Sequence, residues 1–412
     1  MISSLGTRSK FAELGPSGFV RWVYESLGLT RDEFGRPAVR DKLSDGSPRM
    51  RAEEFSLRCL AESLVGVEGA ERLGQVGHPL SMNLLEGANA AVQPSAFQNI
   101  SAFNATVGGL IEAKVLEQYR RPVFIADRVA RTIPTRQRSE RLPATSRIGD
   151  RAETMQPGQP HPRAQFGERY VTTPETQKRG LAIDITKEAV YFDLTNEMLL
   201  RAESIGYELG LRKEKLVLDT VLGLSNSYSY QGSTYNTYLT SGNWVNDHTN
   251  PLVDWTDIDD ALQLFSAMTD QESGERVVVS PTQLLVMPYK ELTAAMVLNS
   301  VMLETRTASA AEVRHAANPL AGKYELLCSP IAYQRLTDAD GGALDASAAR
   351  EYWYFGELHR AFGYMENWAM QVVQARAGDY VMADHGLVLS VFADEMGTPV
   401  VLEPRYVIRN KN

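Results

Sequence analysis

The alternation of apolar and polar positions is clearest over residues 147–223, where a long polar ribbon leads into a long helix. The tip of the ribbon, at 155–162, is dense in proline and glycine, which favour turns. Its return arm, at 169–192, is rich in the β-branched and aromatic residues typical of strands. A ribbon of this length is at best marginally stable alone in water, so the pattern predicts that it lies against another copy of the chain.

The segment after the ribbon has helical periodicity. Between residues 196 and 222, apolar or small residues recur at spacings of three and four, and charged residues fill the other positions. Asp193 or Thr195 can cap the start of this helix, and Gly223 can end it. At 1.5 Å per residue the helix would be roughly 40 Å long. The residues of its apolar face include Met198, Ala202, Ile205, Leu209 and Leu216.

The segments before the ribbon are predicted to be helical. Residues 1–93 are typical of a separate, mostly helical extension that ends in a glycine-rich linker. A second helix is expected from residue 94 to about residue 119, with an apolar stripe that includes Phe97, Ile100 and Phe103. Ser95 and Gln98 have the spacing of a capping box at its start.

From residue 257 onward, helical and strand patterns alternate, which predicts a compact sheet-and-helix domain. Helices are expected at 257–269 and 290–299, and strands at 277–279, 284–286, 325–329 and 352–355. The end of the chain predicts further strands at 368–375, 387–392 and 400–408, with a turn at 395–397. Between the long helix and this domain, residues 224–255 form a polar insertion rich in tyrosine and tryptophan.

Composition narrows the class of protein. Of the 412 residues 43% are hydrophobic and 23% charged, as in globular proteins, and the net charge of -9 argues against a dedicated nucleic-acid binder. The two cysteines, Cys59 and Cys328, provide no disulfide framework. No run of 18 apolar residues exists, so no membrane span is expected.

Arginines are concentrated between residues 120 and 151, with few acids among them. Such a cluster can bind phosphate, or it can form salt bridges to other subunits. The negative charge of the whole chain favours the salt bridges.

No motif in the sequence points to catalysis. The six histidines have no metal-ligand spacing, and neither a nucleophile elbow nor a phosphate-binding loop is present. The acidic string at 338–345 lacks the remaining ligands of a calcium loop and is more typical of a turn. We therefore expect no enzyme activity and no catalytic, cofactor-binding or metal-binding residues.

Three segments, in order, carry a resemblance to a known family. They are KRGLAIDITKE at 178–188 leading into the long helix, SGERVVVSP at 273–281, and YFGE at 354–357 followed by FGY at 362–364. With these segments the chain, over roughly residues 95–412, resembles the major capsid proteins of tailed bacteriophages. These proteins share the HK-ninety-seven-like capsid fold with encapsulins.

The resemblance implies an α+β fold with an N-arm, an extended β-hairpin loop, a peripheral domain with a long spine helix, and an axial domain. The implied segments are a scaffolding-like extension at 1–93, the N-arm and start of the peripheral domain at 94–146, the extended loop at 147–192, the peripheral domain with spine helix and tyrosine-rich insertion at 193–256, the axial domain at 257–355 and closing strands at 356–412.

It also implies which residues belong to the functional parts of the fold and which contact other subunits. The N-arm would carry Phe97, Ile100 and Phe103, and the spine helix would carry the apolar face described above. Contacts of the extended loop would come from Arg147, Arg151, Met155, Pro157, Gly158, Pro160, Pro162, Phe166, Arg169 and Tyr170.

The function implied is that of a structural head protein. It would assemble in the host cytoplasm into hexamers and pentamers of an icosahedral shell, which encloses double-stranded DNA without binding it specifically. Further partners would be a portal, a scaffold or head protease and a cement protein, with no cofactor and no membrane. Some members of the family crosslink their shells through a lysine of the extended loop. Residues 150–177 contain no lysine, so we expect no covalent crosslink here.

Two other functions stay open from the sequence. An encapsulin-type compartment that houses an enzyme would share the fold. A soluble hydrolase with the ribbon as a lid would need a catalytic constellation, for which the sequence offers no candidate.

Overall fold

The computed structural model describes residues 4–31, 36–43, 46–56, 60, 94–143, 170–186, 192, 194–225, 228–242, 244–269, 276–306, 313–338, 344–376 and 387–412. The chain forms two compact units. The first unit consists of Met1–Arg121, Lys178–Arg212 and Trp368–Met396, and the second of Pro122–Gln177, Lys213–Asn367 and Gly397–Asn412. Three long elements are divided between the units: α8 (Thr195–Val221), β15 (Phe362–Arg376) and β16 (Leu387–Val401), while β6 (Gln177–Thr186) has only its first residue in the second unit.

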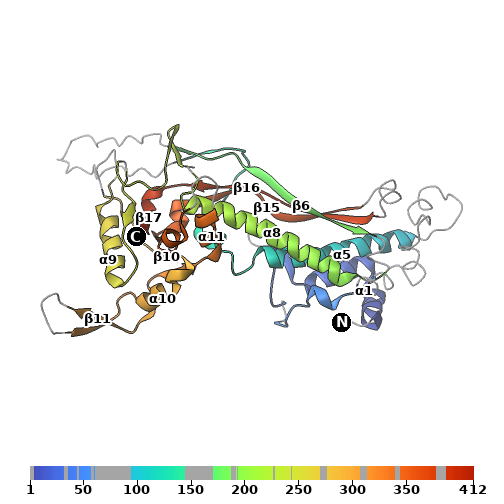
Figure 1. Ribbon diagram of the computed structural model, residues 1–412. Helices are drawn as coiled ribbons and strands as arrows, with labels where there is room; N and C mark the ends of the chain where they lie inside the picture. The colour runs from blue at the N-terminus through green and yellow to red at the C-terminus, as the bar shows by residue number, and fades with distance from the viewer. Residues whose placement is uncertain are drawn as a thin grey trace, which may run out of the picture. The chain divides into compact units, whose positions relative to one another are not determined.

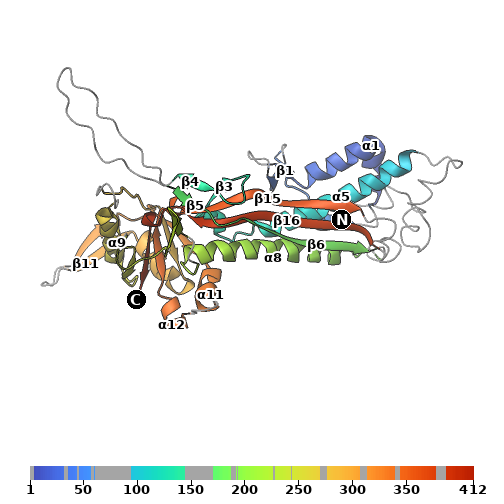
Figure 2. The same cartoon turned by 90° about the horizontal axis from the view of Figure 1, so that it is seen from above.

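The first unit packs helices against a sheet. Its other elements are α1 (Ser4–Ser26), β1 (Leu29–Arg31), β2 (Pro37–Val39), the 3₁₀ turn η1 (Ala52–Glu54), α5 (Pro94–Tyr119) and β6 (Gln177–Thr186). In Figures 1 and 2, β6, β16 and β15 run side by side, with α8 along them and α1 beside α5. The expected long helix is confirmed as α8, and the helix after residue 94 is confirmed as α5.

One hydrophobic core holds the first unit together. Phe19 and Val23 of α1, and Leu27 directly after it, are fully buried, as their spacing of four predicts for one helical face. They lie in the same cluster as Leu110 and Ile111 of α5, together with residues of α8, β6, β15 and β16. The described part of the N-terminal segment therefore shares its core with the helices and strands that follow.

Helices α5 and α8 approach each other closely at Gly206. A Cβ atom at this position would lie 2.3 Å from the carbonyl oxygen of Val115 in α5. Only glycine fits such a close approach of a side-chain position to a backbone, so Gly206 sets how near the two helices lie.

The second unit is built on a five-stranded sheet in the order β13-β10-β14-β17-β9. Its strands are β9 (Asp247–Thr249), β10 (Gln283–Val286), β13 (Glu325–Cys328), β14 (Trp353–Gly356) and β17 (Val407–Lys411). Strand β14 runs antiparallel to β10 and β17, whereas β13 is parallel to β10 and β9 is parallel to β17. The strands expected at 284–286, 325–329 and 352–355 are confirmed as β10, β13 and β14.

Helices α9 (Trp255–Ala267) and α10 (Glu291–Asn299) pack on one face of this sheet. Phe265 and Ala294 lie there in a cluster with Leu284, Trp353 and Phe355. The helix expected at 257–269 is confirmed as α9, whose start is capped by the Asp254 carboxylate accepting from the Thr256 N–H. The remaining short helices and turns are α6 (Ala126–Val129), η2 (Pro288–Lys290), α11 (Pro330–Asp338), α12 (Ala346–Ala349), α13 (Leu358–Ala361) and η3 (Pro404–Tyr406).

Smaller strands complete the second unit. One sheet has the order β4-β5-β7-β8, formed by β4 (Arg141–Pro143), β5 (Tyr170–Thr172), β7 (Tyr228–Tyr230) and β8 (Ser233–Tyr235). Strand β3 (Arg131–Pro134) runs parallel to β15, and β11 (Met302–Arg306) pairs with β12 (Val313–Ala317) in a separate two-stranded ribbon. The tyrosine-rich insertion thus includes the hairpin β7–β8, and Tyr228 packs its ring edge-on against Trp244.

Three local predictions were wrong. The strand expected at 400–408 is interrupted, because β16 ends at Val401 and the 3₁₀ turn η3, which starts at Pro404, precedes β17. Residues 277–279 form no strand, because only an isolated bridge from Thr269 to Arg276 pairs the chain there, and Val278 is exposed. The turn expected at 395–397 is instead the interior of β16. Gly397 is there for packing, since a Cβ would lie 2.6 Å from the Tyr364 ring and 2.7 Å from the Met365 carbonyl oxygen.

Replacing Gly206 with alanine tests the contact between α5 and α8. We expect Gly206→Ala to lower the free energy of unfolding by about 1–3 kcal/mol, because the added methyl group must push the helices apart. The exposed Ser204→Ala, in the same helix, should leave stability unchanged or raise it by about 0.5 kcal/mol. Urea unfolding of the purified subunits, followed by circular dichroism, measures both. Equal stability of the two variants would contradict the contact.

Candidate functional site

The predicted apolar face of the spine helix is an internal packing face. Met198, Ala202 and Leu209 are buried in the core of the first unit, and Ile205 packs against that core. Leu216 is half-buried. These side chains therefore hold α8 in its own subunit and leave the opposite face of the helix for other contacts.

The extended loop is described at its base. Strands β4 and β5 pair antiparallel, with Pro143 opposite Tyr170, so the chain leaves and returns at neighbouring positions. The Arg141 guanidinium lies 4.6 Å from the centre of the Tyr170 ring, and the Gln231 N–H donates to the Tyr170 carbonyl. Of the predicted loop contacts, Tyr170 is thus the described one. Arg147, Arg151, Met155, Pro157, Gly158, Pro160, Pro162, Phe166 and Arg169 lie outside the described residues.

The predicted N-arm contacts belong to the first half of α5. The helix itself is present, but the side chains of Phe97, Ile100 and Phe103 lie outside the described residues. The second half of α5 is packed into the core through Leu110, Ile111 and their neighbours.

Several arginines of the basic stretch have partners within their own unit. Arg128 donates to the Glu325 carboxylate at 2.6 and 3.1 Å, and Arg138 forms a 3.0 Å ion pair with Glu175. Arg121 lies over the Tyr207 ring. These contacts inside a single copy use part of the positive charge that was expected to serve contacts between subunits.

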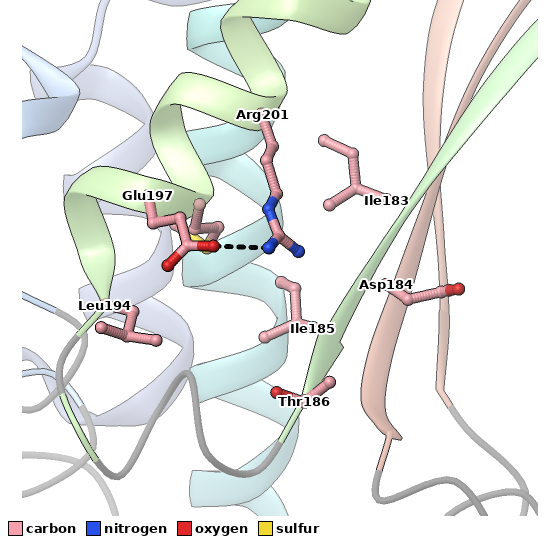
Figure 3. A pocket seen from close by; sticks show the side chains of 8 residues that line it. Ile183, Asp184, Ile185, Thr186, Leu194, Glu197 and Arg201 are labelled. Atoms are coloured by element: carbon pink, nitrogen blue, oxygen red, sulfur yellow. Dashed lines mark hydrogen bonds and ion pairs between the residues drawn. The ribbon is translucent and has the colours of Figure 1, made fainter.

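A pocket lies beside the start of α8 in the first unit (Figure 3). Ile183 and Ile185 of β6 form one wall, and Leu194 and Met198 form the other. An ion pair between Glu197 and Arg201 spans one side of the pocket. Asp184 points away and accepts a hydrogen bond from the Ser390 hydroxyl at 2.6 Å. The pocket therefore combines apolar walls with an ion pair, in about equal parts.

Exposed apolar side chains surround the same end of α8. Phe192 and Leu200 are each about two-thirds exposed, at 66% and 63%. The sequence pattern does not mark either residue, because Leu200 lies off the periodic face of α8 and Phe192 precedes the helix. A large exposed apolar residue next to a pocket is a common feature of protein contact surfaces.

The most perturbed carboxyl group of the second unit is Glu214. Its side chain is fully buried and accepts hydrogen bonds from the backbone N–H groups of Ile125, at 3.1 Å, and Ala126, at 2.7 Å. Burial raises its pKa to about 7, although the two N–H donors act in the opposite direction. The neighbouring Lys213 is paired with Asp127 at 2.8 Å.

No metal-binding constellation was found among the described residues, where no group of three or more His, Cys, Asp or Glu side chains converges. His359 is exposed, and partial desolvation of its ring lowers its pKa. Within the same described ranges, no helix is long and apolar enough to cross a membrane.

A comparison with protein families gives the decisive match. The family model for phage capsid proteins matches residues 169–410, more than half of the chain. The chain belongs to the phage capsid protein family. This capsid protein is therefore a structural component of a virion, as the sequence resemblance predicted, and an encapsulin is not favoured. The matched range starts just before β5 and ends in β17, so it includes all of α8 and the five-stranded sheet.

Solved structures give weaker likenesses. The capsid protein is similar to the capsid of a native GTA particle, with 11% identity and a TM-score of 0.40 over 71% of this chain and 90% of that one. It is also similar to a chain of Mycobacterium phage Ogopogo, with 14% identity and a TM-score of 0.39 over 70% of this chain and 91% of that one. The capsid of the cyanophage P-SCSP1u has 15% identity and a TM-score of 0.39 over 69% of this chain and 85% of that one. The comparison with curated protein sequences found no match.

Burial of Glu214 predicts a pH dependence of stability. Between pH 4.5 and about 7 the folded chain keeps this carboxyl protonated while the unfolded chain does not, so stability falls as pH rises. The loss attributable to Glu214 is up to about 3 kcal/mol. Urea unfolding of Glu214→Gln from pH 5 to pH 8 should lack this part of the slope.

Glu208→Gln provides the matched control, because Glu208 is exposed on the same helix. It should keep the pH dependence of the wild type. A parallel pH dependence in wild type and Glu214→Gln would show that Glu214 does not titrate in this range.

Proposed function

We propose that this capsid protein is the major head protein of a tailed phage and assembles with itself into the hexamers and pentamers of an icosahedral shell around double-stranded DNA. The observation that carries the proposal is the family match over residues 169–410. The long α8, the hairpin base at β4–β5 and the compact sheet-and-helix unit support it as the parts that a spine helix, an extended loop and an axial domain require. Assembly takes place in the host cytoplasm, and the chain has no enzyme activity.

The mechanism is mechanical and additive. A shell repeats each contact between subunits many times, so contacts of modest strength produce a stable particle. The extended loop contributes such contacts from the residues between β4 and β5. The pocket beside α8, with the exposed Phe192 and Leu200, supplies a second surface. A portal, a scaffold or head protease and a cement protein act on the same shell.

The charge of the chain suits a container for DNA. With a net charge of -9, the wall repels packaged DNA at short range and does not bind it specifically. The internal ion pairs Arg128–Glu325 and Arg138–Glu175 support this assignment, because they neutralise part of the basic stretch.

We propose that the N-terminal segment up to residue 60 stays in the assembled shell. Phe19, Val23, Leu27, Phe55 and Leu60 lie in the same core as α5 and α8. Removing them would expose the apolar face of α5 to water, at about 25 cal/mol for each Å² uncovered. Any scaffolding role of the extension is therefore carried out without removal of the residues up to 60.

Expression of the chain alone tests the proposal. We expect negative-stain microscopy to show closed shells or capsomer rings, because the chain carries the contacts needed for self-assembly. The intact mass of these particles should include the N-terminal segment. A monodisperse monomer with hydrolytic activity would overturn the capsid function in favour of an enzyme.

Particles should contain no covalent link between subunits. Lys178, the lysine nearest the loop, forms a 2.7 Å ion pair with Asp394. Its ammonium group lies 5.9 Å from the centre of the Trp368 ring. We therefore expect a single monomer band after boiling in detergent, both in the wild type and in Lys178→Arg. A ladder of bands that disappears in Lys178→Arg would show crosslinking through this residue.

A further inference from the structure

Helix α10 of the second unit has two apolar faces. Ala294, Val297 and Leu298 are buried against the five-stranded sheet. On the opposite side, Tyr289, Leu292 and Met296 follow at spacings of three and four, and Val301 comes after the helix end. They are 61%, 73%, 70% and 83% exposed, respectively. We call these four residues the α10 stripe. A surface helix normally keeps a polar outer face, so the stripe calls for a covering partner.

The neighbouring helix α9 shows that packing on this sheet does not require an apolar outer face. Helix α9 packs on the same face of the sheet through Ile258, Ala261 and Phe265. Its exposed positions are polar apart from Ala267 at its end, and include Asp259, Asp260 and Gln263. Because both helices cover one sheet face, an apolar outer surface on α10 alone indicates a specific contact.

A two-stranded ribbon directly follows the stripe in the sequence, and it too needs a contact that stabilises it. The ribbon β11–β12 (Met302–Arg306 and Val313–Ala317) pairs with no other described strand. A two-stranded ribbon by itself is marginally stable in water. In Figures 1 and 2 it extends away from the rest of the second unit.

The base of the ribbon is fixed so that it cannot cover its own stripe. The Asn318 side-chain amide donates to the Val297 carbonyl at 2.9 Å and lies 3.1 Å from the Ser300 hydroxyl. The Asn318 N–H donates to the Val301 carbonyl at 3.2 Å. These bonds tie the return strand to the end of α10 and direct the ribbon outward. Any ribbon that covers the stripe therefore comes from another copy of the chain.

The charges of the two surfaces are complementary. The ribbon strands contain Arg306 and Arg314 against the single acid Glu304. The stripe is next to the exposed Glu291, and α9 on the same sheet face presents Asp259 and Asp260. At Tyr289 the Arg350 guanidinium stacks on the ring, 4.7 Å from its centre, and orients it. A ribbon whose strands carry an excess of basic residues is suited to a surface that presents these acids.

We propose that the ribbon β11–β12 of a second copy lies on the α10 stripe. The inference rests on the proposed self-assembly and names a contact within it. The two surfaces are different, so the contact is heterologous, and repeating it around an axis closes a ring of subunits. This is the geometry that a hexamer or pentamer requires.

Charged substitutions on the stripe test the need for the contact. Leu292→Glu together with Met296→Glu should fold normally by circular dichroism, because both side chains are exposed, but should raise the concentration needed for assembly by about tenfold or more. Val278→Glu is the matched control, since Val278 is 62% exposed in the same unit and outside the stripe. It should assemble like the wild type. Normal assembly of the double variant would overturn the contact.

Cysteine pairing tests the identity of the partner. In a chain with Cys59→Ser and Cys328→Ser, the pair Leu292→Cys and Leu303→Cys should form disulfides between copies in assembled particles under mild oxidation. Each single cysteine variant should form none, because a heterologous contact places different residues together. Disulfides in the Leu292→Cys single variant, or within one copy of the pair, would overturn the ribbon as partner. A wild type that stays monomeric under all conditions would instead overturn the proposed function.

Discussion

The first unit depends on how closely α8 approaches α5. At Gly206 the distance between the helices leaves no room for a side chain, because the position of a Cβ is occupied by the backbone of Val115. With the helices this close, the short and medium side chains Ala202, Val115 and Leu209 can fill the space between them. On its other side α5 binds α1, and α8 binds the strands of the sheet. One core thus connects Phe19, near the start of the chain, with Val391, near its end.

The second unit is fixed by buried polar contacts in addition to its apolar core. The side-chain amide nitrogen of Asn246 lies 3.0–3.2 Å from the carbonyl oxygens of Thr237, Pro404 and Val407, and its oxygen accepts from the Leu239 N–H. The Asp247 carboxylate accepts from Arg409 and Lys411. These bonds attach the tyrosine-rich insertion to strand β17. Because unsatisfied buried polar groups are costly, this network permits one placement of the insertion and disfavours others.

The surfaces that we propose for assembly differ in kind from these cores. The α10 stripe is apolar and exposed, and the pocket beside α8 combines apolar side chains with an ion pair. The core residues are buried within a single copy, whereas the residues of the stripe are exposed there and, in our proposal, become covered when copies meet. In that proposal folding does not need the surfaces that unite copies, and modest contacts suffice because the shell repeats them.

The sequence by itself determined the long helix, most strands of the sheet and the family. The period of 3.6 between Met198 and Leu216, and the buried runs at 284–286 and 352–355, depend on local spacing, which a sequence displays directly. It failed where a residue's role depends on a distant neighbour. Glycine favours turns, but Gly397 lies inside β16. The Tyr364 ring across the sheet leaves no room there for a side chain. Residues 277–279 have the composition of a strand, but none of the described strands pairs with them. Likewise, only the fold showed which apolar face of α10 is buried. The choice between Ala294 and Leu292 is made by the sheet against which the helix packs, and spacing along one helix does not contain that information.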